Sequence, residues 1–124
     1  MKFLSILSVI ALSAIATEAT ASPLTDAGDK LFQQRCAVCH STGTDGKPGP
    51  MAPNLRGVVG RKAGSTTFGN YSPALKASNL IWSEDGIATF LTDPKQMVPG
   101  TKMVIKVASP QDRAALAAYL GSLK

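Results

Sequence analysis

Two stretches of the chain, one near each end, repeat their apolar residues with the spacing of an amphipathic helix. In the first, residues 25–37, one face collects Gly28, Leu31, Phe32 and Cys36. Thr25 or Asp26 is the expected N-cap of this helix. In the second, which begins near residue 110, the apolar stripe is made of Leu116, Tyr119, Leu120 and Leu123. Ser109 is its expected N-cap, followed by Pro110 and by Asp112 in a capping-box arrangement.

A third helix is predicted between these two. Ser83 is a good N-cap, acidic residues follow it in the first turn, and Pro94 stops the helix. A short helix is also expected after Ser72. Strand signals are weak, because residues 58–59 and 103–107 are short apolar runs without sustained alternation. The pattern therefore predicts an all-α class with three main helices, short helices and much irregular backbone.

The irregular backbone is concentrated between residues 43 and 69. The chain has 11 glycines and 8 prolines, and many of them lie in this stretch. A long segment without periodicity is unusual inside a small compact domain. It becomes reasonable if the loop wraps around a large apolar group that replaces part of the core. The pattern thus favours a bound cofactor.

The first 21 residues are typical of a secretory signal peptide. A lysine at position 2 precedes the apolar run of residues 3–16, and the small residues Ala19 and Ala21 follow in the order of a cleavage site. The alternative is an uncleaved anchor helix, but the run is shorter than the ~20 residues needed to span a bilayer. We therefore expect cleavage after Ala21, leaving residues 22–124 as one domain.

The formal net charge is +5, which favours acidic partners or surfaces. The basic residues are spread along the chain without a dense run, so nucleic acid is not an expected partner. A basic surface that is merely solvated is the competing interpretation of the charge.

Both cysteines and the only histidine lie within five residues, as Cys36, Cys39 and His40. A redox dithiol of the thioredoxin type is disfavoured, because no βαβ pattern surrounds the pair. A structural zinc site would lack a fourth cysteine or histidine ligand. Covalent haem attachment uses every part of C-x-x-C-H, with two thioethers and a proximal histidine. An export signal fits this chemistry, and it predicts a periplasmic location.

The second axial ligand cannot be another histidine, which leaves methionine, lysine, water or no ligand. After residue 21 the chain contains three methionines, Met51, Met97 and Met103. Met103 follows the turn signal Pro99-Gly100, which favours it among the three.

These residues resemble the class I c-type cytochromes, the family of mitochondrial cytochrome c and its bacterial relatives. The resemblance runs from GDKLFQQRCAVCH through PNLRGVVGRKAG and NLIWSEDGIATFLTDPKQMVPGTKM to DRAALAAYL. It implies the cytochrome c fold, with helices and long loops wrapped around one covalently bound haem c. Cys36 and Cys39 match the thioether cysteines, and His40 and Met103 match the axial iron ligands. Pro53 matches the proline whose carbonyl accepts the other N–H of the proximal histidine.

The resemblance also implies roles for residues around the haem. Arg61, Tyr71 and Trp82 match residues that bind the inner propionate or its waters, although a solvated arginine and two core aromatics are the alternative. Gly28 and Phe32 match the crossing of the first and last helices. Three positions depart from the pattern of many relatives, each removing a polar or aromatic group near the haem. They are Leu75 for asparagine, Phe90 for tyrosine and Ile105 for an aromatic residue.

With two axial ligands the iron would be closed to substrate, so the chain is expected to be a soluble, monomeric electron carrier and not an enzyme. The implied partners are acidic surfaces of membrane complexes, such as a bc1-type complex and a terminal oxidase or reaction centre. The basic residues expected to ring the docking face are Lys30, Arg35, Lys47, Lys95 and Lys102. The alternatives are a haem-based peroxidase-like or gas-binding protein with a labile sixth ligand, a permanently bound subunit of one complex, and a thiol oxidoreductase.

Overall fold

The computed structural model describes residues 22–124, so the predicted signal peptide lies outside the described residues. The first helix, α1, spans Pro23–Arg35. Its N-cap is Ser22, whose hydroxyl accepts the N–H of Thr25, and Pro23 fills the first helical position. The prediction that Thr25 or Asp26 caps the helix is therefore wrong. The helix also ends before residue 37, because the chain turns at Cys36, whose carbonyl accepts the N–H of His40.

The other two main helices begin where the capping residues predict. α3 (Glu84–Thr92) starts after Ser83, whose hydroxyl accepts the N–H of Gly86, and α5 (Pro110–Ser122) starts after Ser109. The Ser109 hydroxyl accepts the N–H of Asp112, but within residues 22–124 no bond returns from the Asp112 carboxylate, so only half of a capping box forms. Pro94 does stop α3, and it also begins the short helix α4 (Pro94–Met97). The short helix after Ser72 is α2 (Pro73–Ala77).

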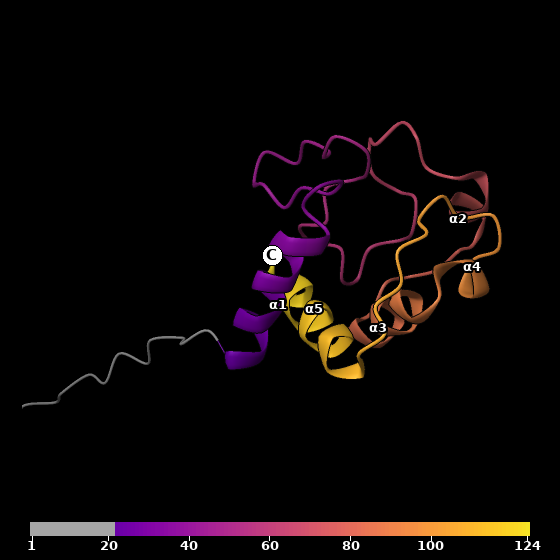
Figure 1. Ribbon diagram of the computed structural model, residues 1–124. Helices are drawn as coiled ribbons and strands as arrows, with labels where there is room; N and C mark the ends of the chain where they lie inside the picture. Colours follow the sequence, from indigo (N-terminus) through magenta and orange to yellow (C-terminus); the bar gives the residue numbers. More distant parts are fainter. Residues whose placement is uncertain (1–21) are drawn as a thin grey trace, which may run out of the picture.

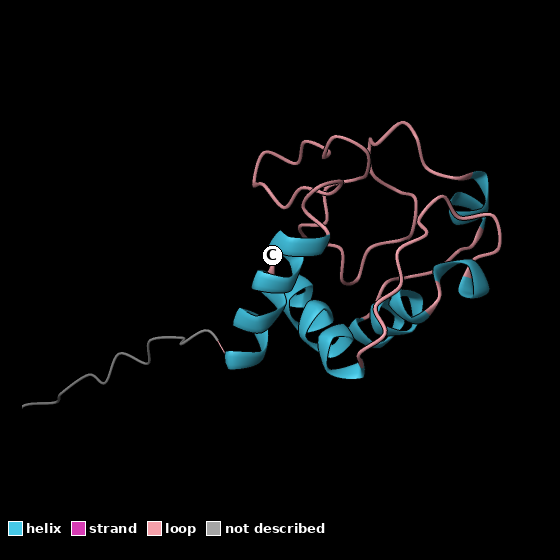
Figure 2. Ribbon diagram, viewed as in Figure 1, coloured by secondary structure: helices cyan, strands magenta, loops and turns pink. Residues whose placement is uncertain are grey.

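The all-α prediction is confirmed. Across the described residues the only strand-like pairings are two isolated bridges, Ser41 with Asn54 and Lys62 with Ile81. Long loops connect the helices and account for one side of the molecule (Figure 2). None of the helices in residues 22–124 combines the length and the apolar character needed to cross a membrane.

The helices α1 and α5 lie side by side, and α3 packs against α5 (Figure 1). Gly28 makes the first contact possible, since a Cβ atom there would overlap the carbonyl of Ala115 and lie 2.6 Å from Cβ of Tyr119. One turn further along, the ring of Phe32 packs against that of Tyr119 with centroids 5.6 Å apart. The predicted crossing of the first and last helices is therefore present.

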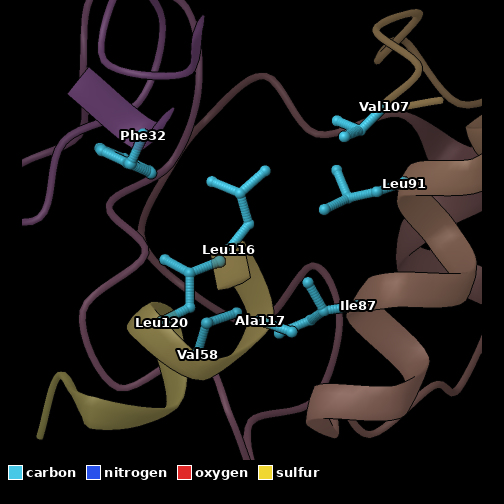
Figure 3. Packing of buried hydrophobic residues seen from close by; sticks show 8 residues of the cluster. All are labelled: Phe32, Val58, Ile87, Leu91, Val107, Leu116, Ala117 and Leu120. Atoms are coloured by element: carbon cyan, nitrogen blue, oxygen red, sulfur yellow. The ribbon is translucent and has the colours of Figure 1, made fainter. Parts of the chain in front are cut away.

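The buried core lies where the three main helices meet the adjoining loops. Its centre contains residues from α1, α3 and α5 together with Val58 and Val107 from loops (Figure 3). Phe32, Leu116 and Val107 are almost completely buried. Burial of a side chain of this size contributes about 1.5–3 kcal/mol. Val58 and Val107 connect the adjoining loops to this core.

Candidate functional site

A cavity of about 510 Å³ lies between the helical core and the loops. Most of its wall is apolar, with Phe32, Leu116 and Leu120 from the core, Leu55 from a loop, Leu75 from α2 and Phe90 from α3. The charged side chains of this wall, within the described chain, are all cations: Arg35, Arg61 and Lys102. Its volume and apolar lining are those of a cofactor pocket.

The turn after α1 places His40 in this wall. Its Nδ1 atom lies 2.9 Å from the carbonyl oxygen of Pro53. A carbonyl oxygen only accepts hydrogen bonds, so Nδ1 is the protonated nitrogen and the lone pair remains on Nε2. Burial lowers the pKa of His40, and the bond to Pro53 partly opposes that effect. The imidazole is therefore neutral at pH 7 and able to ligate a metal through Nε2.

The two cysteines lie in the same wall. Both are half-buried free thiols, carried by the turn that follows α1. Burial raises the pKa of the Cys36 thiol, while Arg35 beside it has the opposite effect. No group of three histidine, cysteine or acidic side chains in residues 22–124 is arranged to hold a metal ion. Two thiols and an imidazole facing one apolar cavity fit a haem joined to the protein through thioethers.

The three methionines occupy different environments. Met103 is half-buried, lines the cavity and packs against the core. Met51 also lines the cavity, but it is 72% exposed, and its N–H donates to the carbonyl of Cys39, on the same loop as the cysteines. Met97 belongs to α4 and lines a separate, smaller cavity with Asp93. Of the three, Met103 alone is both sheltered and in the wall of the main cavity.

The three predicted propionate-binding residues all line the cavity. The Arg61 guanidinium donates to the carbonyl oxygens of Asn54, at 2.9 Å, and Arg56, at 3.2 Å. The Tyr71 hydroxyl lies 2.5 Å from that of Thr66.

Trp82 completes this group of three. Its ring packs edge-on against Phe90, with centroids 5.1 Å apart. Arg61 therefore forms hydrogen bonds to backbone carbonyls that the sequence did not predict. The propionate-binding roles of Arg61, Tyr71 and Trp82 stay predictions.

The three departures from the family pattern also face the cavity. Leu75 is half-buried, Phe90 is buried and Ile105 is exposed at the rim. Phe90 has no hydroxyl, and its ring packs against that of Trp82. These residues make the wall more apolar than a polar asparagine and tyrosine would.

The five predicted docking cations fall into two groups. Arg35 and Lys102 line the cavity, and both are anchored: Arg35 donates to the carbonyl of Lys106, and Lys102 donates to the side-chain and backbone oxygens of Asn70. The other three are exposed but lie outside the cavity wall, and they are Lys30, Lys47 and Lys95.

The rim of the cavity also carries exposed apolar side chains. These exposed residues are Val38, Met51, Val104 and Ile105.

The sequence interpretation missed the polar residues that hold the loops together. Asn54 is 5% exposed and bonds to three backbone groups, while Thr101 is buried beside the cavity. Asparagine, serine and threonine in a loop ordinarily indicate a turn at the surface. Only the position of Asn54 directly after Pro53 could have drawn attention to it.

Comparison with known proteins agrees with this site. The family model described as cytochrome c matches residues 25–124. The chain is 46% identical over 96 residues to cytochrome c2 of Rhodomicrobium vannielii, covering 77% of this chain and 75% of that one. It is 47% identical over 94 residues to cytochrome c of Theileria annulata, covering 75% and 80% of the two chains. It is 41% identical over 95 residues to cytochrome c of Cannabis sativa, covering 76% and 85%.

Proposed function

The chain belongs to the cytochrome c family, and from that premise we propose that it is a mono-haem electron carrier with His40 and Met103 as axial ligands. Family membership and the Cys36-x-x-Cys39 pair imply one covalently bound haem c. When bound, the haem iron supplies a one-electron Fe(III)/Fe(II) couple. The observation that carries the proposal is that one mostly apolar cavity has both thiols, the neutral imidazole and a half-buried methionine in its wall.

The residues of the wall support this role in separate ways. Nε2 of His40 keeps its lone pair because Nδ1–H is bonded to Pro53. Met103 offers a neutral soft sulfur, which favours the reduced state. Apolar side chains such as Leu75 and Phe90 exclude water. The cation Arg61 and the indole N–H of Trp82 are suited to the two carboxylates of a haem.

We propose that redox partners dock at the rim of this cavity. The apolar side chains there, Val104 and Ile105 among them, would exclude water from the contact, while Arg35 and Lys102 attract an acidic partner surface. Partners of this kind are a bc1-type complex and a terminal oxidase or reaction centre. The predicted signal peptide and the likeness to a bacterial cytochrome c2 support a periplasmic location.

Absorption spectra of the holoprotein and three methionine variants test the ligand assignment. We expect a weak far-red methionine–iron band in the wild type that is lost in Met103→Ala. It should remain in Met51→Ala and Met97→Ala, the matched controls. A high-spin, five-coordinate wild type at neutral pH would overturn the carrier proposal and favour a peroxidase-like or gas-binding protein. Release of the haem by acid–acetone would contradict covalent attachment.

A further inference from the structure

Asn54 is the most highly connected polar side chain of the loops. It is 5% exposed, and its Nδ2 atom donates to the carbonyl oxygens of Gly43 and Lys47, each at 3.0 Å. Its Oδ1 atom accepts the N–H of Arg56 at 2.8 Å. Two carbonyls need a donor and one N–H needs an acceptor, so the surroundings allow only one orientation of the amide. Every polar atom of this buried side chain is therefore satisfied.

The backbone of Asn54 is held as firmly as its side chain. Its carbonyl oxygen accepts from Arg61 at 2.9 Å, and it forms a bridge with Ser41. The next residue, Leu55, donates its N–H to the carbonyl of Ser41 at 2.8 Å. These contacts join the segment that follows His40 to the segment that follows Pro53.

The carbonyl that bonds to His40 belongs to the peptide group between Pro53 and Asn54. A peptide group is planar, so fixing Asn54 also fixes the direction of the Pro53 carbonyl. Pro53 itself has no N–H with which to anchor this turn. Gly43 and Lys47, which Asn54 binds, lie only three and seven residues after His40. Asn54 thus links the two chain segments whose separation sets the 2.9 Å contact between His40 and Pro53.

We propose that Asn54 is a positioning residue that holds the Pro53 carbonyl against Nδ1–H of His40 and thereby sets the tautomer and basicity of the iron ligand. A carbonyl acceptor on Nδ1–H makes the imidazole a stronger donor through Nε2. A stronger donor stabilises Fe(III), so loss of this bond shifts the equilibrium toward Fe(II). The inference rests on the proposed role of His40 as the axial ligand.

The test uses the haem-containing protein and the variant Asn54→Ala, which removes all three side-chain bonds. We expect the His40 Nδ1–H proton of the reduced protein, followed by NMR, to exchange with solvent at least tenfold faster than in the wild type. We also expect the Fe(II)/Fe(III) ratio at a fixed potential to rise by up to tenfold, which corresponds to about 59 mV. The matched control is Ser109→Ala, which removes the cap of α5 and should leave both readouts within twofold of the wild type.

Asn54→Ser is the milder variant, because it keeps a polar group but is too short to reach both carbonyls. We expect a smaller change of the same sign in both readouts. Unchanged exchange and an unchanged potential in a folded Asn54 variant would overturn the proposal. So would failure of both variants to fold while Ser109→Ala folds, since Asn54 would then serve the fold as a whole. If the absorption spectrum of the wild type lacked the features of histidine–methionine ligation, the proposed function itself would be wrong.

Discussion

The molecule has a helical half and a loop half, and different interactions hold them together. The helical half is formed by α1, α3 and α5, which bury Phe32, Leu116 and Leu91 among other apolar side chains. The loop half, residues 41–82 and 98–109, is held largely by hydrogen bonds to backbone carbonyls. The Arg56 side chain, for example, donates to the carbonyl oxygens of Thr42 at 2.8 Å and Lys124 at 3.3 Å.

This difference shows which half depends on the cofactor. The helical half has an interior of packed side chains, whereas the loop half meets it across a cavity of about 510 Å³ that residues of both halves line. Most of the wall of this cavity is apolar, and leaving such surface in contact with water is unfavourable. A whole domain is stabilised by only about 5–15 kcal/mol. The loop half should therefore keep its structure only with a group bound in the cavity.

The largest expected effect comes from preventing haem attachment with the double variant Cys36→Ala, Cys39→Ala. We expect it to lose the cooperative unfolding transition, because the loop half would have no apolar group to enclose. Circular dichroism during denaturation and amide hydrogen exchange measure this. The loss of protection should be greatest in residues 41–82.

The matched control for this variant is Val38→Ala, which lies between the two cysteines and is 73% exposed. It should keep the haem and unfold with a free energy close to that of the wild type. A haem-free cysteine variant that still unfolded cooperatively, within about 2 kcal/mol of the holoprotein, would contradict the division into two halves, since single core changes alone reach that size.

A smaller effect is expected from disturbing the helical half at Gly28. The Gly28→Ala substitution places a methyl group against the Ala115 carbonyl and Tyr119, so α1 must move away from α5. Overpacking of this kind costs about 1–3 kcal/mol. We expect the free energy of unfolding, measured with denaturant, to fall by about 3 kcal/mol, while the far-red methionine–iron band of the folded protein is retained.

Gly69→Ala is the control for Gly28→Ala. No heavy atom lies within 4 Å of a Cβ placed at Gly69, so its stability should match that of the wild type. If Gly28→Ala were no less stable than Gly69→Ala, the close approach of α1 and α5 would not be a requirement of the fold.

The two halves also differ in how well the sequence predicts them. The caps of α3 and α5, Ser83 and Ser109, act within a few residues of themselves, so their effect is visible in the local pattern. The sequence pattern misplaces the start of α1, because Thr25 and Asp26 are also good N-cap residues, although Pro23 directly after Ser22 is itself a start signal. This error shifts the predicted start of α1 by a few residues, but the helix itself is correctly predicted.

In the loop half, the sequence predicted the haem-binding residues but not the hydrogen bonds that hold the loops in place. C-x-x-C-H predicts a haem site because three scarce residues are adjacent. The contacts of Arg61 with the Asn54 carbonyl and of Lys102 with Asn70 join residues 7 and 32 positions apart. Such contacts follow no regular spacing in the sequence. In the sequence, a buried polar loop residue also cannot be distinguished from an exposed one. The fold class could be predicted from the sequence. The hydrogen bonds of Asn54, next to Pro53, could be identified only from the structure.

The smallest expected effect concerns an ion pair near the boundary of the two halves. Asp93, between α3 and α4, accepts a hydrogen bond from Lys106 in the loop half, with Oδ2 and Nζ 3.0 Å apart. The hydrogen bond from Lys106 holds the pKa of Asp93 below its usual value of 3.8. A carboxylate with a lowered folded-state pKa stabilises the protein fully above its unfolded pKa, and this contribution is lost as the pH falls through the folded value. Stability from this pair should thus be constant near neutral pH and decline below about pH 4.

The variants Asp93→Asn and Lys106→Gln, singly and together, measure this contribution by thermal unfolding at pH 7 and at successively lower pH. Each single variant should be slightly less stable than the wild type at pH 7, and the double variant should show that the two losses are not additive. The difference between wild type and Asp93→Asn should shrink as the Asp93 carboxylate is protonated. Additive losses at pH 7, or a difference that grew with acid, would show that this ion pair does not connect the two halves.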